Sequence, residues 1–185
     1  VAAAAGLRQP SLFHYFANKD DVLAELLDRT VTPALEFVGW LAQQPEAAEV
    51  RLVALAWHDT HTLCSGPHNL GALQLLPEAR AERFAPFWAK RARLQRGYRD
   101  LVRGCGAPKP EVSAELVFGL VESVIVWYRR GGRLRPAAAA DEVALGALRL
   151  ATGRGGTFER QRHAAAALLA SAPRAEGGRS ALRLS

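Results

Sequence analysis

The sequence predicts an all-α protein, and three observations support that prediction. Apolar residues recur every three or four positions along most of the chain, which is the period of an amphipathic helix. Proline and glycine interrupt this pattern at intervals of about one helix length, and no run of alternating β-branched residues predicts a strand. With 185 residues, of which 49% are hydrophobic and 23% charged, the chain has enough apolar mass to bury a core.

Composition argues against several other classes of protein. No stretch of about eighteen uncharged apolar residues predicts a membrane span, and no charged segment leading into an apolar one predicts a secretory signal. Cys64 and Cys105 are the only cysteines, too few for a disulfide framework. We therefore expect a cytoplasmic protein with no membrane partner.

Two short helices are predicted at the beginning of the chain. Residues 1–5 are helix formers that stop at Gly6, a residue suited to the end of a helix. Pro10 fits the first turn of a second helix over 9–16, where its missing N–H is harmless. Two short helices joined by a glycine-containing turn form a helix-turn-helix, whose second helix lies in the major groove of DNA.

A longer helix is predicted to follow. Asn18 is expected to be its N-cap, and Asp20 and Asp21 place negative charge in its first turn, where the helix dipole favours it. Leucine and valine at helical spacing carry the pattern to Leu41. Pro33 lies inside this stretch and is expected to kink or split the helix.

The rest of the chain predicts further helices separated by proline and glycine. They are expected over residues 46–64, 70–76, 78–103, 111–130, 137–151 and 159–172, with a disordered tail at 173–185. The helix over 111–130 carries two apolar ridges. It is therefore expected to bury one side in its own domain and the other against a second surface.

The first 27 residues closely resemble the DNA-binding signature of the TetR family of transcriptional regulators. That signature combines an Ile/Val-Ala pair, an Ala-Gly turn, a small hydroxyl residue, a Leu-aromatic pair and a Lys-Asp helix start. The matching residues are Val1-Ala2, Ala5-Gly6-Leu7, Ser11, Leu12-Phe13, Tyr15-Phe16, Asn18-Lys19-Asp20 and Leu23. The helices up to about residue 152 resemble the rest of the family fold more weakly.

The resemblance implies a TetR-like organisation of the all-α fold. It places an incomplete helix-turn-helix DNA-binding segment and a connecting helix at 1–45, and a helical regulatory and dimerisation domain at 46–152. Residues 153–185 would form a partly disordered tail with a possible extra helix. Family members carry a further helix before the helix-turn-helix, so we expect the chain to be truncated at its N-terminus.

The resemblance also implies a function. The chain would be a homodimeric DNA-binding transcriptional regulator, a repressor that binds a palindromic double-stranded operator and is released by an unknown small molecule. It would be no enzyme and would need no cofactor. The residues that the resemblance places at the DNA are Arg8, Gln9, Ser11, Phe13, His14, Tyr15 and Lys19. Arg8 and Gln9 suit base reading, and Lys19 suits a backbone phosphate.

Two further sets of residues are expected in the regulatory domain. The ligand pocket is predicted to be aromatic, with a few polar groups. Its residues would be Trp57, His61, Phe87, Trp88 and Trp127. The dimer interface is predicted as a two-fold contact made by the helices over 111–130 and 137–151. Its residues would include Val117, Val121, Val124 and Tyr128.

Two alternatives remain open at this point. Imidazole and thiolate groups gather in one segment, which would suit an α-helical metal-dependent protein: His58, His61, Cys64 and His68. Their spacing rotates around a helix, so we predict no metal site. The other alternative is a truncated paralogue that serves only to dimerise. Enzyme motifs such as GxSxG, HExxH and the Walker A loop are absent from the sequence.

Overall fold

The computed structural model describes residues 18–153 and 158–173. All regular structure in these residues is helical, as predicted. The α-helices are α2 (Lys19–Leu41), α3 (Ala48–Ser65), α4 (Ala85–Gly104), α5 (Pro110–Trp127), α6 (Pro136–Thr152) and α7 (Phe158–Ser171). Three 3₁₀ helices join α3 to α4: η2 (Leu70–Leu75), η3 (Pro77–Arg80) and η4 (Glu82–Phe84). Within the described ranges, no helix is long and apolar enough to cross a membrane.

Helix α2 begins where the sequence predicted. The Asn18 side chain accepts hydrogen bonds from the backbone N–H groups of Asp20 and Asp21, at 2.9 and 3.0 Å. This cap satisfies donors that the first turn would otherwise leave open. Pro33 lies inside α2 but does not split it: the helix runs unbroken to Leu41. The predicted helix-turn-helix over residues 1–16 lies outside the described residues.

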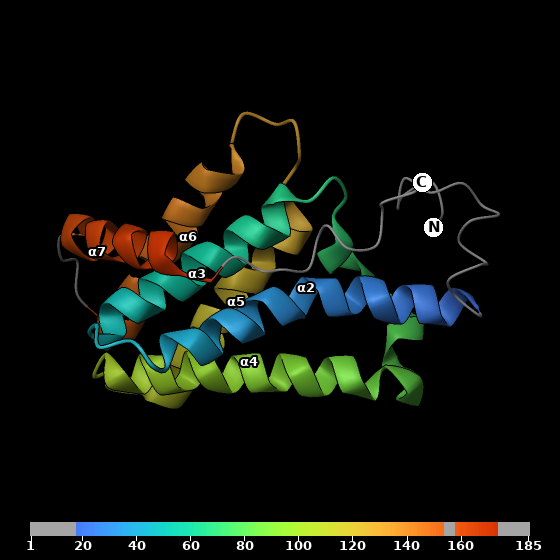
Figure 1. The fold of residues 1–185 in the computed structure, drawn as a ribbon, viewed down its shortest axis with the longest axis horizontal. Helices are drawn as coiled ribbons and strands as arrows, with labels where there is room; N and C mark the ends of the chain where they lie inside the picture. Colours follow the sequence, from blue (N-terminus) through green and yellow to red (C-terminus); the bar gives the residue numbers. More distant parts are fainter. Residues whose placement is uncertain (1–17, 154–157, 174–185) are drawn as a thin grey trace.

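Helix α3 forms the centre of the bundle. It packs against α2, α4, α5, α6 and α7, so its residues 52–56 are buried on every side. Figure 1 shows α2 and α4 lying side by side along one edge of the molecule, with α6 and α7 on the other side of α3. A helix buried all round must be apolar all round, which explains the continuous apolar run Leu52-Val53-Ala54-Leu55-Ala56.

The segment before α4 differs from the prediction. One long helix was expected over 78–103, but 3₁₀ turns occupy residues 77–84 and α4 starts only at Ala85. Pro86 explains the difference, because proline is tolerated in the first turn of a helix and breaks a helix interior. Helix α5 also ends at Trp127 instead of residue 130, since Tyr128 already has an extended backbone.

Close contacts between helices depend on two glycines. A Cβ atom at Gly97 of α4 would lie 2.6 Å from Cγ2 of Val38 in α2, and one at Gly146 of α6 would lie 2.8 Å from Cδ2 of Leu120 in α5. A side chain at Gly97 would press on the short, branched Val38, whereas the end of the Leu120 side chain would have to move aside for one at Gly146. The close α2–α4 contact keeps the two helices parallel neighbours beside the core.

Candidate functional site

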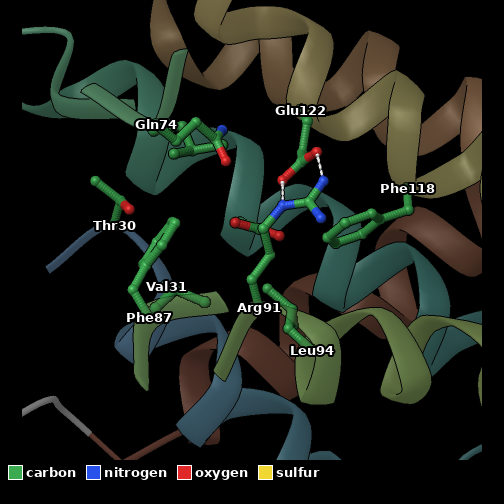
Figure 2. Close-up of a pocket in the computed structure, with 10 residues that line it drawn as sticks. Thr30, Val31, Gln74, Phe87, Arg91, Leu94, Phe118 and Glu122 are labelled. Atoms are coloured by element: carbon green, nitrogen blue, oxygen red, sulfur yellow. Dashed lines mark hydrogen bonds and ion pairs between the residues drawn. The ribbon is translucent and has the colours of Figure 1, made fainter. Parts of the chain in front are cut away.

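A small cavity lies where five elements meet, beside the central helix. Its walls come from α2, α3, η2, α4 and α5. The cavity has a volume of about 20 Å³, which is room for about one water molecule. Its lining residues are Thr30, Val31, Asp59, Leu63, Gln74, Phe87, Arg91, Leu94, Phe118 and Glu122 (Figure 2).

A buried carboxyl group faces this cavity. Asp59 of α3 is only 4% exposed, and the hydroxyl of the fully buried Tyr98 donates to its Oδ2 atom at 3.0 Å. Burial raises the pKa of Asp59 to about 7, with a further rise from the nearby Glu122 and a partial offset from the Tyr98 hydrogen bond. Burial also raises the pKa of Tyr98 well above its usual value. The pair is therefore a neutral or singly charged polar unit inside an apolar core.

An ion pair borders the same cavity. The Arg91 guanidinium of α4 donates two hydrogen bonds to the Glu122 carboxylate of α5, one of them from Nε at 2.7 Å. Figure 2 shows the two groups facing each other, with the Phe118 ring beside the guanidinium. That guanidinium lies 4.8 Å from the Phe118 ring centroid, within the range of a cation–π contact. Both charged residues are half-buried, so this fork is held more firmly than a surface pair.

The aromatic residues expected to line one pocket do not gather around this cavity. Trp57 stacks on His61 and donates from its indole nitrogen to Asp141 of α6 at 3.0 Å, on the side of α3 that faces α6. Trp88 donates to the Ala79 carbonyl, and Trp127 lies exposed near the end of α5. Of the five predicted residues only Phe87 lines the cavity. Helical spacing could not say which flank of its helix each aromatic ring would face.

The sequence signal that could have found the cavity is a carboxylate inside an apolar stretch. Asp59 follows the buried run 52–56 and precedes the fully buried Thr60. A charged residue at such a position needs a partner from another element. Tyr98 is that partner, 39 positions further along the chain. The apolar periodicity of the sequence does not show that these two residues meet.

The residues of the histidine and cysteine cluster have other surroundings than a metal site. His58 stacks on Phe37 with ring centroids 4.3 Å apart, and burial lowers its pKa to about 4. Cys64 is buried, which raises the pKa of its thiol to about 11. Among the described residues no group of three or more His, Cys, Asp or Glu side chains could hold a metal ion. The cluster therefore gives no support to a metal-dependent protein.

The predicted dimer residues need correction. Val117, Val121 and Val124 are at most 2% exposed in a single protomer, so they have no surface left to lose to a partner. Tyr128 is half-buried and packs edge-on against Trp127. The other ridge of α5 is the exposed one, because α3 and α6 occupy the face that was expected to be free. Its exposed apolar residues are Val112, Leu116, Val126 and Trp127.

The predicted DNA-binding residues lie almost entirely beyond the part of the chain that the structure describes. This applies to Arg8, Gln9, Ser11, Phe13, His14 and Tyr15. Lys19 is the exception. It is exposed at the first residue of α2, directly after the Asn18 cap.

The comparison with solved structures finds several related folds, two of which follow. The crystal structure of Mycobacterium smegmatis AmtR matches with a TM-score of 0.78 and 43% sequence identity, over 93% of this chain and 83% of that one. A transcriptional regulator of the TetR/AcrR family from Thermobifida fusca matches with a TM-score of 0.59 and 24% identity, over 84% of this chain and 85% of that one. The scan of protein-family models and the search of curated proteins found no match.

The fold and these relatives define the class of the protein, which is an all-α, DNA-binding transcriptional regulator. The chain belongs to the TetR family of transcriptional regulators. Regulators of this family bind operator DNA and act as dimers. The resemblance found in the first 27 residues is therefore confirmed for the family and for the TetR-like fold.

Replacing Asp59 with asparagine should change how stability depends on pH. The folded protein holds this carboxyl at a pKa near 7 against 3.8 in its ordinary state, so it contributes less stability as pH rises from about 4 to 7. The Asp59→Asn protein should therefore gain stability relative to the wild type across that window, by at most about 4 kcal/mol. Chemical denaturation at several pH values measures the difference.

The same exchange at the exposed Asp100 is the matched control. It removes a carboxylate without touching a buried group. If the difference between Asp59→Asn and the wild type stays constant from pH 4 to 7, the pKa of Asp59 is not raised by burial.

Proposed function

We propose that the chain is a repressor whose affinity for its operator falls when a small molecule enters the cavity beside Asp59. The observation that carries this proposal is the buried Asp59–Tyr98 pair, placed next to the half-buried Arg91–Glu122 pair. Burying a carboxyl group without a cation to neutralise it is costly, and such groups gather at functional sites. An incoming molecule with a hydrogen-bond donor would find an acceptor there.

The cavity is also well placed to act on the DNA-binding segment. Thr30 and Val31 of α2 form one wall, and α2 begins directly after the helix-turn-helix segment predicted from the sequence. Because the cavity holds only about one water, a larger molecule has to move its walls apart. Such a molecule favours a different position of α2, and so a different spacing of the two DNA-binding segments of a dimer.

The DNA-binding residues are proposed on the family resemblance. Arg8 and Gln9 read bases, while Ser11, Phe13, His14 and Tyr15 complete the contact surface of the recognition helix. Lys19 holds a backbone phosphate, and its exposed position at the start of α2 supports that role. Two such helices about 34–36 Å apart read the two halves of a palindrome. On the same family resemblance we propose that the protein acts in the cytoplasm and serves as a regulator, not as an enzyme.

The homodimer is proposed to form through the exposed ridge of α5 together with α6. Val112, Leu116 and Val126 are each more than half exposed, at 56%, 53% and 61%, and lie on one stripe of α5. Gly119 lies on the same stripe, and a Cβ atom there would meet nothing within 4 Å. An apolar stripe with a small residue at its centre suits close packing against its own two-fold copy.

The effector site can be tested by loss of response. Compounds that release operator DNA from the wild-type protein should release it poorly from Asp59→Ala, because the cavity then lacks the side-chain acceptor that recognises them. Fluorescence anisotropy with labelled operator measures both DNA affinity and release. Asp59→Ala should bind operator as the wild type does, and equal release from both proteins would contradict the proposed site.

The DNA contacts can be separated by their effect on specificity. Lys19→Ala should weaken binding to operator and random DNA alike, because a phosphate contact carries no sequence information. Gln9→Ala should lose about 1–3 kcal/mol on the operator alone if the side chain pairs bidentately with a base. Titrations of both DNA types at fixed salt measure this, and equal losses on both DNAs would remove Gln9 from the readout.

The dimer interface can be tested with two arginine substitutions. Leu116→Arg should give a folded monomer, because it places a charge in the proposed contact without entering the core. Leu75→Arg, at a similarly exposed leucine of η2, is the control and should stay dimeric. Light scattering gives the mass and circular dichroism the helix content. A dimeric Leu116→Arg protein would exclude this ridge of α5.

A further inference from the structure

A second hollow lies outside the site already described. It is an open groove between α2 and α4, with a volume of about 400 Å³, which is in the range of small-molecule sites. The two helices run side by side there, as Figure 1 shows. The lining residues are Leu35, Val38, Gly39, Leu41, Ala42, Arg51, Arg93, Arg96, Gly97, Asp100 and Leu101.

Two glycines shape this groove. Gly97 allows α4 to approach Val38 of α2 closely. Gly39 has the opposite surroundings, because a Cβ atom built there would meet nothing within 4 Å. Helix α2 thus leaves open space at the position where any other residue would project a side chain. Leu35, Val38 and Leu101 provide apolar wall beside it.

Three arginines line the groove, and none of them forms an ion pair with a described acidic residue. Arg51 donates to the Leu41 carbonyl at 3.3 Å, while its buried Nε atom has no hydrogen-bond partner. Arg93 and Arg96 are exposed on α4.

The other cations along α4 behave differently. Lys90 pairs with Asp28, Arg91 with Glu122, Arg99 with Glu111 and Glu115, and Arg103 with Glu111. Asp100 is the acidic residue of the groove lining, and Arg103 lies 3.4 Å from it. The groove therefore keeps three guanidinium groups against one carboxylate.

We propose that this groove binds a small organic phosphate. The arginines take the phosphate oxygens, for which guanidinium groups offer paired N–H donors, and the apolar wall takes the organic part. An excess of two positive charges favours a phosphate dianion over a carboxylate. This site goes beyond the proposed effector cavity, which presents carboxyl groups and is lined by an earlier part of α2, at Thr30 and Val31.

The groove is too far along α2 to be a DNA contact. Leu35 is 17 residues after Asn18, which places it roughly 26 Å along the helix from the end that carries the DNA-binding segment. Backbone phosphates of an operator are held near the beginning of α2, where Lys19 lies. The phosphate that fits the groove is therefore that of a free small molecule.

Calorimetric titration of the full chain without DNA tests this. Phenyl phosphate is the probe, and we expect it to bind with a Kd below about 1 mM. Phenol lacks the charge and benzoate carries a single one, so both should bind at least about tenfold more weakly. Inorganic phosphate lacks the apolar part and should also bind more weakly.

Two kinds of substitution distinguish this site from any other. The double substitution Arg93→Ala with Arg96→Ala should weaken phenyl phosphate binding at least about tenfold. Gly39→Leu keeps all charges and should abolish binding by filling the groove, while helix α2 tolerates the new side chain. Arg160→Ala removes an exposed arginine from α7 and is the matched control.

No binding of phenyl phosphate to the wild type would overturn the proposal. Equal binding by phenol or benzoate would do so as well, as would full binding by the Gly39→Leu or the double arginine protein. None of these results bears on operator release through the Asp59 cavity, because no DNA is present. Circular dichroism checks that each variant keeps its helix content.

Discussion

The hydrogen bond from Tyr98 to Asp59 joins two helices at the place where the protein can least accommodate charge. Helix α3 is in contact with five other helices, and its buried residues are apolar apart from this residue and Thr60. A carboxyl group there must lose its hydration, and one hydroxyl group compensates for only part of that loss. The packing of α2, α4 and α5 around α3 therefore depends on the hydrogen bond that this carboxyl group accepts.

Opposite charges line the two hollows beside the α2–α4 pair. The enclosed cavity holds Asp59 and Glu122, with Arg91 as the counter-charge. The open groove holds Arg51, Arg93 and Arg96. The cavity therefore favours a hydrogen-bond donor or a cation, and the groove favours an anion. Helices α2 and α4 form walls of both. A ligand in either region acts on the same pair of helices.

The order of the helices could be predicted from the sequence, and so could the cap at Asn18, because both depend on local chemistry. Capping, proline and glycine act within a few residues, and apolar periodicity shows that a segment is helical. The late start of α4 also has a local cause, which is Pro86 in its first turn. Basic and apolar residues continue at helical spacing before Pro86, so the pattern wrongly predicted one long helix.

The candidate sites could not be predicted in the same way. Helix α5 has two apolar ridges, and only the packing of α3 and α6 decides that Val121 is core and Leu116 is surface. Likewise Tyr98 meets Asp59 through a contact between residues 39 positions apart. Periodicity identifies faces, but which face meets which partner is a property of the whole bundle.

Pro33 gives α2 a mechanical weak point. Proline has no N–H to donate to the carbonyl of Arg29, and the Thr30 hydroxyl one turn earlier donates to the Leu27 carbonyl at 2.6 Å, an arrangement that often bends helices. The turn lies between the wall of the enclosed cavity at Thr30 and the open groove from Leu35 onward. Helix α2 is thus less a rigid rod than two stiff segments joined by a compliant turn, and bending stress from either segment concentrates there.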